Sequence, residues 1–277
     1  METRSSHLSD AHDVVIVGGG VAGSALATIL ARERISVAVL ERDLAPVDRV
    51  RGEFTMPWGV AELKRLDLLG PLCAAGGFFV GRQVPYDENM PGDAALPFTL
   101  DVTAVHPEVP GAFCMGHPAM CAALAAEAEA AGAAYLRGVE GIANEDHWTE
   151  NPTARGVVLV GDAAGHNDPI TGQGLSIALR DVRLVSEPIL AGRRDLDSFQ
   201  PYVEERLERM RRLRIAARLA ATLRAEFGEE ARLRRQRAGR RIRTDKMLSP
   251  IPAVLVGPER LPAAAFEQRT IDALVAP

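Results

Sequence analysis

The chain has 277 residues, 47% of them hydrophobic and 25% charged, and a formal net charge of −5 at pH 7. This length and composition suit one large α/β domain with a partial second one and a real core. Because the sequence has no apolar run of membrane-spanning length and Met1–His12 is polar rather than signal-like, we expect a cytoplasmic protein without a membrane span.

The cysteines and histidines give no sign of a metal centre. Cys73, Cys114 and Cys121 have neither CxxC spacing nor an even count, so we expect them to be reduced, buried and inert. The six histidines show no recognisable ligand spacing. The sequence therefore predicts no metal site.

The first predicted element is a buried parallel strand over residues 13–17, which leads through a glycine-rich turn into a helix over 21–34. In such a turn Gly18 allows the tight bend, Gly20 lets the backbone approach a pyrophosphate, and Gly23 lets helix and strand pack closely. The motif as a whole reads Gly18-Gly19-Gly20-Val21-Ala22-Gly23.

A second strand follows over residues 36–40 and ends in Glu41. An acidic residue at this place binds the hydroxyls of a ribose. Strand, turn, helix and acid together predict a dinucleotide site, and the alternative is an ordinary glycine turn.

The middle of the chain contains shorter elements. We expect a helix over 54–69 ended by Gly70-Pro71, strands and loops over 81–100, an alanine-rich helix over 118–131 and a strand over 133–137. The next segment, 142–152, is polar.

A second glycine-rich segment, residues 155–181, has the order strand, turn, helix. Residues 157–160 predict a short buried strand with Asp162 at its carboxyl end, where open α/β sheets bind ligands. Pro169–Gly174 predicts a tight loop without bulky side chains, and Leu175 begins a helix whose positive end faces that site. The alternative is a strand, loop and helix without a ligand.

The C-terminal third is helical and basic, with fourteen arginines against seven acidic residues between Tyr202 and Asp245. One interpretation is a nucleic-acid or anionic-membrane patch. We favour a helix packed on one face and solvated on the other, because apolar residues recur at helical spacing and glutamates lie within reach of the arginines. The apolar set is Leu207, Met210, Leu213, Ile215, Leu219 and Leu223. We therefore expect no nucleic-acid partner, and we expect the Pro- and Ala-rich residues 246–277 to wrap back over the body.

The two glycine-rich segments, with Arg51-Gly52-Glu53 between them, resemble the FAD-dependent monooxygenases of the para-hydroxybenzoate hydroxylase type, whose relatives include squalene epoxidases, geranylgeranyl reductases and flavin halogenases. The resemblance covers roughly residues 13–141 and 154–200. It implies FAD as cofactor, NAD(P)H as reductant, and hydroxylation or epoxidation of a small organic substrate by O₂ through a flavin C4a-hydroperoxide.

The implied fold is α/β, with a Rossmann-like FAD-binding domain of the glutathione-reductase type. We expect this FAD-binding domain at residues 1–80 and 150–200, a truncated substrate-binding β layer at 81–149 and a helical C-terminal region at 201–277.

By the same resemblance, Glu41 takes the adenosine ribose, Arg42 lies by the adenine and Arg51 reaches toward the pyrophosphate and flavin. Asp162 suits the ribitol hydroxyls of the flavin, and the helix beginning at Leu175 stabilises its reduced, anionic form. His117 stands where the family has a basic cofactor contact, although it is equally expected as a helix cap. The full set of expected cofactor-binding residues is Gly18, Gly20, Val21, Ala22, Gly23, Glu41, Arg42, Arg51, His117, Asp162, Pro169, Gly172, Gly174 and Leu175.

No side chain is expected to act as a catalytic nucleophile, and His166 either assists proton movement, holds the backbone or points to solvent. The chain departs from the family between Gly141 and the second segment, where the remaining substrate-sheet strands are missing, and it contains no Asp-Gly dipeptide. Three functions stay open at this point: a monooxygenase, a reductase or dehydrogenase of the same fold, and a catalytically impaired FAD-binding remnant.

Overall fold

The computed structural model describes residues 11–48, 52–84, 86, 92–139, 148–244 and 249–276. Its centre is a three-stranded parallel sheet in the order β1 (Val14–Val17), β2 (Val37–Glu41) and β8 (Ala134–Arg137). The register aligns Ile16 with Val39 and Val39 with Tyr135. The strands predicted over 13–17, 36–40 and 133–137 are therefore confirmed, but the burial expected for the first is wrong, because Val15 and Val17 are exposed.

Helices α1 (Val21–Arg32) and α5 (His117–Ala130) pack on each other, and α1 also packs on α6 (Gly174–Leu190). Their apolar side chains, with those of β1 and β2, make the main core. Leu30, Leu124 and Leu179, one from each helix, have no solvent exposure. The alanine-rich composition of α5 suits this packing because small side chains let the helix axes approach closely.

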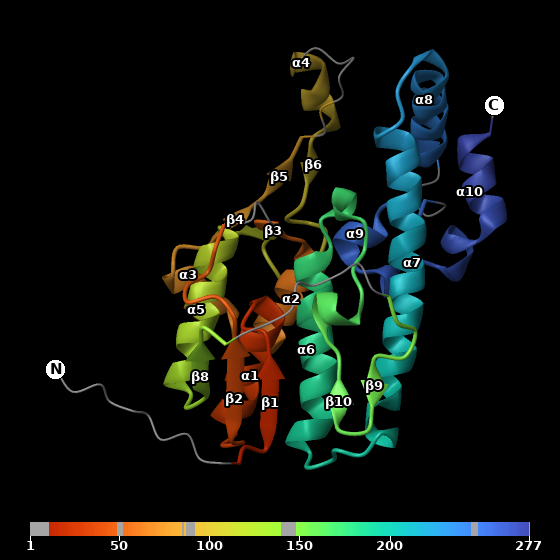
Figure 1. Ribbon diagram of the computed structural model, residues 1–277. Helices are drawn as coiled ribbons and strands as arrows, with labels where there is room; N and C mark the ends of the chain where they lie inside the picture. The colour runs from red at the N-terminus through yellow and green to blue at the C-terminus, as the bar shows by residue number, and fades with distance from the viewer. Residues whose placement is uncertain are drawn as a thin grey trace.

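The region between β2 and α5 forms a second, smaller layer (Figure 1). It contains the antiparallel sheet β3 (Phe54–Thr55), β7 (Ala112–Cys114) and β4 (Phe78–Val80), in that order, and helices α2 (Pro57–Arg65) and α3 (Leu69–Ala74). The paired strands β5 (Arg82–Gln83) and β6 (Leu100–Asp101) lead to the short helix α4 (Gly92–Ala95).

The single helix predicted over 54–69 is wrong. Residues 54 and 55 form β3 instead, and the helix begins at Pro57 and ends at Arg65. Pro71 lies in the first turn of α3, where a proline costs no helical hydrogen bond, so Gly70-Pro71 opens a second helix rather than ending the first.

The buried strand predicted over 157–160 is also corrected. β10 covers only Val157–Val158 and pairs antiparallel with β9 (Thr153–Ala154), and Val157 is half-exposed. Gly156, at φ +77°, turns the chain back so that β9 takes the hydrogen bonds of β10. β1 is consequently an edge among the described strands, with Val17 84% exposed (Figure 1).

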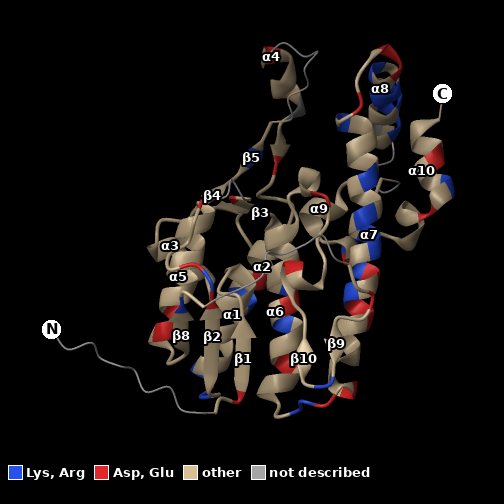
Figure 2. Ribbon diagram, in the orientation of Figure 1, with Lys and Arg blue, Asp and Glu red and all other residues tan. Residues whose placement is uncertain are grey.

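The C-terminal region is helical, as predicted, with α7 (Gln200–Arg224), α8 (Glu229–Thr244), α9 (Ala253–Val256) and α10 (Gln268–Val275). α9 contacts α7 and α2, so the chain after α8 does return to the body. Figure 2 shows the Lys and Arg positions, in blue, spread along α7 and α8.

The apolar face predicted for α7 is correct for Met210, Leu213, Leu219 and Leu223, which are buried, and wrong for Leu207, which is 43% exposed. Within the described residues, no helix is both long enough and apolar enough to cross a membrane.

Candidate functional site

The first glycine turn lies at the carboxyl end of β1. Gly18 has φ +99°, a conformation that favours glycine, and its N–H donates to the carbonyl of Leu40 at 2.8 Å. A Cβ at Gly23 would lie 1.9 Å from the Gly18 carbonyl oxygen, so no larger residue fits between helix and strand. A Cβ at Gly20 would meet nothing within 4 Å, which leaves the backbone there open to a ligand.

The N-terminus of α1 adjoins this open position. Its N-cap is Gly20, which has no side chain to cap the helix, and the first turn of α1 holds no acidic residue. The backbone N–H groups at a helix N-terminus need acceptors, and together with the helix dipole they favour an anion.

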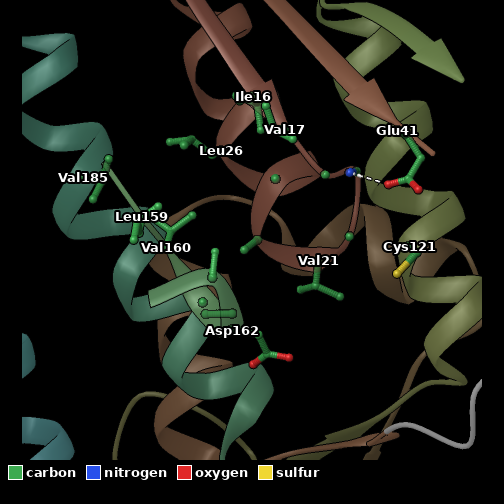
Figure 3. Close-up of a pocket in the computed structure, with 18 of the residues that line it drawn as sticks. Ile16, Val17, Val21, Leu26, Glu41, Cys121, Leu159, Val160, Asp162 and Val185 are labelled. Atoms are coloured by element: carbon green, nitrogen blue, oxygen red, sulfur yellow. Dashed lines mark hydrogen bonds between the residues drawn. The ribbon is translucent and has the colours of Figure 1, made fainter. Parts of the chain in front are cut away.

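Glu41 ends β2 beside the turn. Its Oε2 accepts a hydrogen bond from the Gly19 N–H at 2.5 Å (Figure 3). Its Oε1 accepts one from the Asp43 N–H at 2.8 Å. A carboxylate has about four acceptor positions, so two remain for hydroxyl groups of a ligand.

Tyr135 is part of this turn, and sequence reasoning missed it. Its hydroxyl donates to the Gly19 carbonyl at 2.9 Å, and Ser24 Oγ donates to the same carbonyl at 2.8 Å. A Cβ at Gly19 would lie 2.0 Å from the Tyr135 hydroxyl. Burial raises the pKa of Tyr135 and keeps it in the donating form. The β8 register places Tyr135 here, and nothing in the linear sequence indicates it.

The second glycine-rich segment packs against the first. The turn η2 (Gly161–Ala164) follows β10, and Gly161 has φ +58°. A Cβ at Gly161 would lie 3.3 Å from the Ala22 Cβ, so this turn sits directly on α1. Asp162 is exposed and lines the same cavity as the first turn (Figure 3).

The loop before α6, residues 168–173, is fixed by hydrogen bonds of the side chains at its two ends, Asp168 and Gln173. Asp168 Oδ1 accepts the Ile170 N–H at 2.9 Å, and Gly172 has φ +60°. Gln173 is buried, and its amide accepts from Trp58 Nε1 at 3.0 Å and donates to the Val254 carbonyl at 3.0 Å. Helix α6 has no side-chain cap, so its N-terminus also stays available to a ligand.

One cavity of about 1790 Å³ joins these parts. It is larger than the roughly 300–1,000 Å³ of most small-ligand pockets. Figure 3 shows Ile16, Val17 and Leu26 on one side of it, and Leu159 and Val185 on the other. Every residue that the sequence indicates for cofactor binding lines this cavity except Arg51, which lies outside the described residues.

His117 lies at the first position of α5 and lines the cavity, while Gly116 occupies the N-cap position. The alternative of His117 as a helix cap is therefore wrong. Arg42 also lines the cavity, with its Nε 3.2 Å from Asp43 Oδ1. His166 is exposed at the same cavity.

The three cysteines differ in environment. Cys121 is buried at the cavity wall, and burial raises its thiol pKa to about 11. Cys114 is half-buried, and burial raises its pKa as well. Cys73 is exposed, so the expectation that all three are buried is correct only for Cys121. Over the part of the chain that the structure describes, no group of three or more His, Cys, Asp or Glu side chains is placed to hold a metal ion.

The arginines of α7 are not all solvated. Arg206 and Arg209 are only 1% and 3% exposed, and both pair with the buried Asp181 of α6. Arg211 and Arg212 instead pair with Glu208 within the helix, as the sequence predicts.

Two family models match the chain. One, described as FAD binding domain, matches residues 11–70, and the other, squalene epoxidase, matches residues 136–221. These two stretches contain the first and second glycine-rich segments.

Several similar proteins are squalene monooxygenases or epoxidases. The mouse squalene monooxygenase is 35% identical over 91 residues, which cover 33% of this chain and 16% of the relative. Squalene epoxidase of Saccharomyces cerevisiae is 36% identical over 92 residues, covering 29% of this chain and 18% of the relative. The match thus spans less than a fifth of the length of either relative.

Two solved structures share the fold. The probable FAD-dependent monooxygenase pqsL from Pseudomonas aeruginosa superposes with a TM-score of 0.62 at 13% identity, covering 76% of this chain and 96% of that one. A flavoprotein/dehydrogenase from Cytophaga hutchinsonii gives a TM-score of 0.64 at 12% identity, covering 88% and 92%. These superpositions confirm the Rossmann-like FAD-binding fold predicted from the sequence.

Proposed function

We propose that this chain, whose matched segments fit the superfamily of FAD-dependent monooxygenases, binds FAD and uses it to insert one atom of O₂ into a small organic substrate. The observation that carries the proposal is the single cavity, because the first turn, Glu41, Asp162 and the loop before α6 all line it.

The residues of this cavity fit FAD in chemistry and in shape. Gly20 and the N-terminus of α1 leave open backbone for the pyrophosphate, and Glu41 keeps two acceptor positions for the ribose. Asp162 would accept from the ribitol hydroxyls, and the uncapped N-terminus of α6 would face the pyrimidine side of the flavin. By the same resemblance, Arg42 would lie by the adenine, Arg51 would reach toward the pyrophosphate and flavin, and His117 would be a basic contact to the cofactor.

Bound FAD, once reduced, would supply the activation of O₂. The protein's own part is to hold the cofactor and to stabilise negative charge near α6 through fixed backbone dipoles. We also propose that NAD(P)H is the reductant, that the protein is cytoplasmic and that it has no nucleic-acid partner.

We also propose a division of the chain into domains. The parallel sheet contains β8, and α5 packs on α1, so we propose that 117–137 belong with the FAD-binding domain although the sequence groups 81–149 together. We propose that 81–114 are what remains of the substrate-binding layer and that 201–277 form the helical region.

The visible absorption spectrum of the purified protein tests cofactor binding, recorded as isolated and again after incubation with FAD and gel filtration. We expect retained flavin absorbance. Protein that is colourless in both samples would contradict FAD binding. Substrate-dependent consumption of O₂ and NAD(P)H then tests the monooxygenase activity, and alkene reduction without O₂ would contradict it in favour of a reductase.

A further inference from the structure

The buried ion cluster between α6 and α7 contacts the second glycine turn directly. Asp181, on α6, has no solvent exposure. Its Oδ1 accepts from Arg209 Nη2 at 2.5 Å, and its Oδ2 accepts from Arg206 Nε at 3.2 Å. The same Oδ2 accepts the backbone N–H of Gly161 at 2.9 Å.

Arg206 reaches past Asp181 to the other end of this turn. Its Nη2 donates to the Gly165 carbonyl at 2.9 Å and lies 3.4 Å from the Gly161 carbonyl. Asp181 and Arg206, neither of which lines the cavity, therefore hold both ends of the five-residue turn Gly161–Gly165. Charged hydrogen bonds in such a dry site are stronger than neutral ones, so they fix the turn firmly.

Arg209 provides a contrast on the same helix. It is as buried as Arg206 and shares the Asp181 carboxylate, but its other contacts go to Glu205 and the Ile177 carbonyl. The two arginines thus share one partner and one degree of burial, and they differ in whether they contact the turn.

We propose that Arg206, acting with Asp181, is a positioning residue for the cofactor site: it holds the turn Gly161–Gly165 in the conformation that presents Asp162 to FAD. This inference rests on the proposed function, because the turn serves FAD only if the cavity binds it. α7 is then part of the cofactor site rather than a separate helical appendage.

The test compares Arg206→Lys with Arg209→Lys in the full chain. Each change weakens the Asp181 pair, so we expect both to lower the melting temperature by similar amounts. We expect only Arg206→Lys to raise the Kd for FAD at least tenfold, measured by quenching of flavin fluorescence. Hydrogen exchange of the FAD-free protein should become faster at Gly161–Gly165 in Arg206→Lys and stay slow there in Arg209→Lys.

Asp181→Asn is a second variant, which keeps the shape of the side chain and removes its charge. We expect it to raise the Kd for FAD as well, so the test does not depend on Arg206→Lys being folded. Arg211→Lys is the surface control, because Arg211 is exposed and pairs with Glu208.

The outcomes separate the inference from the proposed function. If the wild-type chain binds FAD and the Kd for FAD is the same in Arg206→Lys as in Arg209→Lys, the inference is overturned and the proposed function stands. If the wild-type chain binds no FAD, the proposed function fails and the positioning role fails with it.

Discussion

Glu62 and Arg180 lie 2.5 Å apart, measured from Oε1 to Nε, although the Glu62 side chain has no exposure to solvent. Arg183 Nε lies 2.6 Å from the other oxygen of the same carboxylate, and Arg65 Nη1 lies 3.0 Å from Oε1. This cluster joins α2 to α6, and α6 begins at the loop that lines the cofactor cavity.

Glu62→Gln should destabilise the fold strongly. The change removes the buried carboxylate of the cluster, while Arg180 keeps Glu205 and Glu259 as partners and Arg183 keeps Glu187, so we expect a cost of about 1.5–3 kcal/mol. Urea unfolding should show this loss in the free energy of unfolding. Glu187→Gln is the matched control, because Glu187 also pairs with Arg183 but is exposed, and we expect its cost to be below about 1 kcal/mol. Equal effects of the two changes would contradict this reading of the cluster.

Gly20→Ala and Gly23→Ala should separate ligand binding from folding. A Cβ at Gly20 meets open space, so Gly20→Ala should cost about 1 kcal/mol of stability at most while weakening FAD binding at least tenfold. A Cβ at Gly23 would overlap the Gly18 carbonyl, so Gly23→Ala should lower both the stability of the fold and the affinity for FAD. Thermal unfolding and FAD titration measure the two effects. Gly70→Ala, also at an open position, is the control, and an unchanged FAD affinity in Gly20→Ala would argue against pyrophosphate at Gly20.

The three thiols should react in order of exposure. With a pKa of about 11, Cys121 has a thiolate fraction of only about one in a thousand at pH 8, and it is buried. Exposed Cys73 should therefore be alkylated first and Cys121 last, as followed by mass spectrometry of iodoacetamide-treated protein. When the protein is unfolded in urea, the three thiols should be alkylated at similar rates. Fast alkylation of Cys121 in the native protein would show that its side of the cavity is open.

The Tyr135 phenol should ionise only above its ordinary range. Since its folded pKa is raised, its contribution to stability is fully present below the unfolded pKa of about 10 and is lost as the pH rises through the folded value. A titration at 295 nm in the native protein should show delayed ionisation that Tyr135→Phe removes in part. The remaining delayed signal should come from Tyr202, whose pKa is also raised by burial. A titration identical to that of the unfolded chain would contradict the burial of both phenols.

By itself, the sequence determined those structural elements that depend only on residues close together in the chain. The order of apolar strand, glycine turn and helix is a local pattern, because the backbone φ, the size of the side chain and the start of a helix each depend on residues within a few positions. It therefore indicated β1, α1, β2 and Glu41, and it indicated the second glycine turn with Asp162, together with the family that uses these segments for FAD.

Only the tertiary structure decided which distant groups hold those parts. Tyr135 contacts Gly19, Asp181 and Arg206 contact Gly161 and Gly165, and Trp58 contacts Gln173. These pairs lie far apart in sequence, and each depends on register or helix packing, which no local pattern specifies. The pairing of β10 with β9 was missed for the same reason: a strand's place is set by which neighbour satisfies its hydrogen bonds, and the chain's own reversal at Gly156 brought that neighbour.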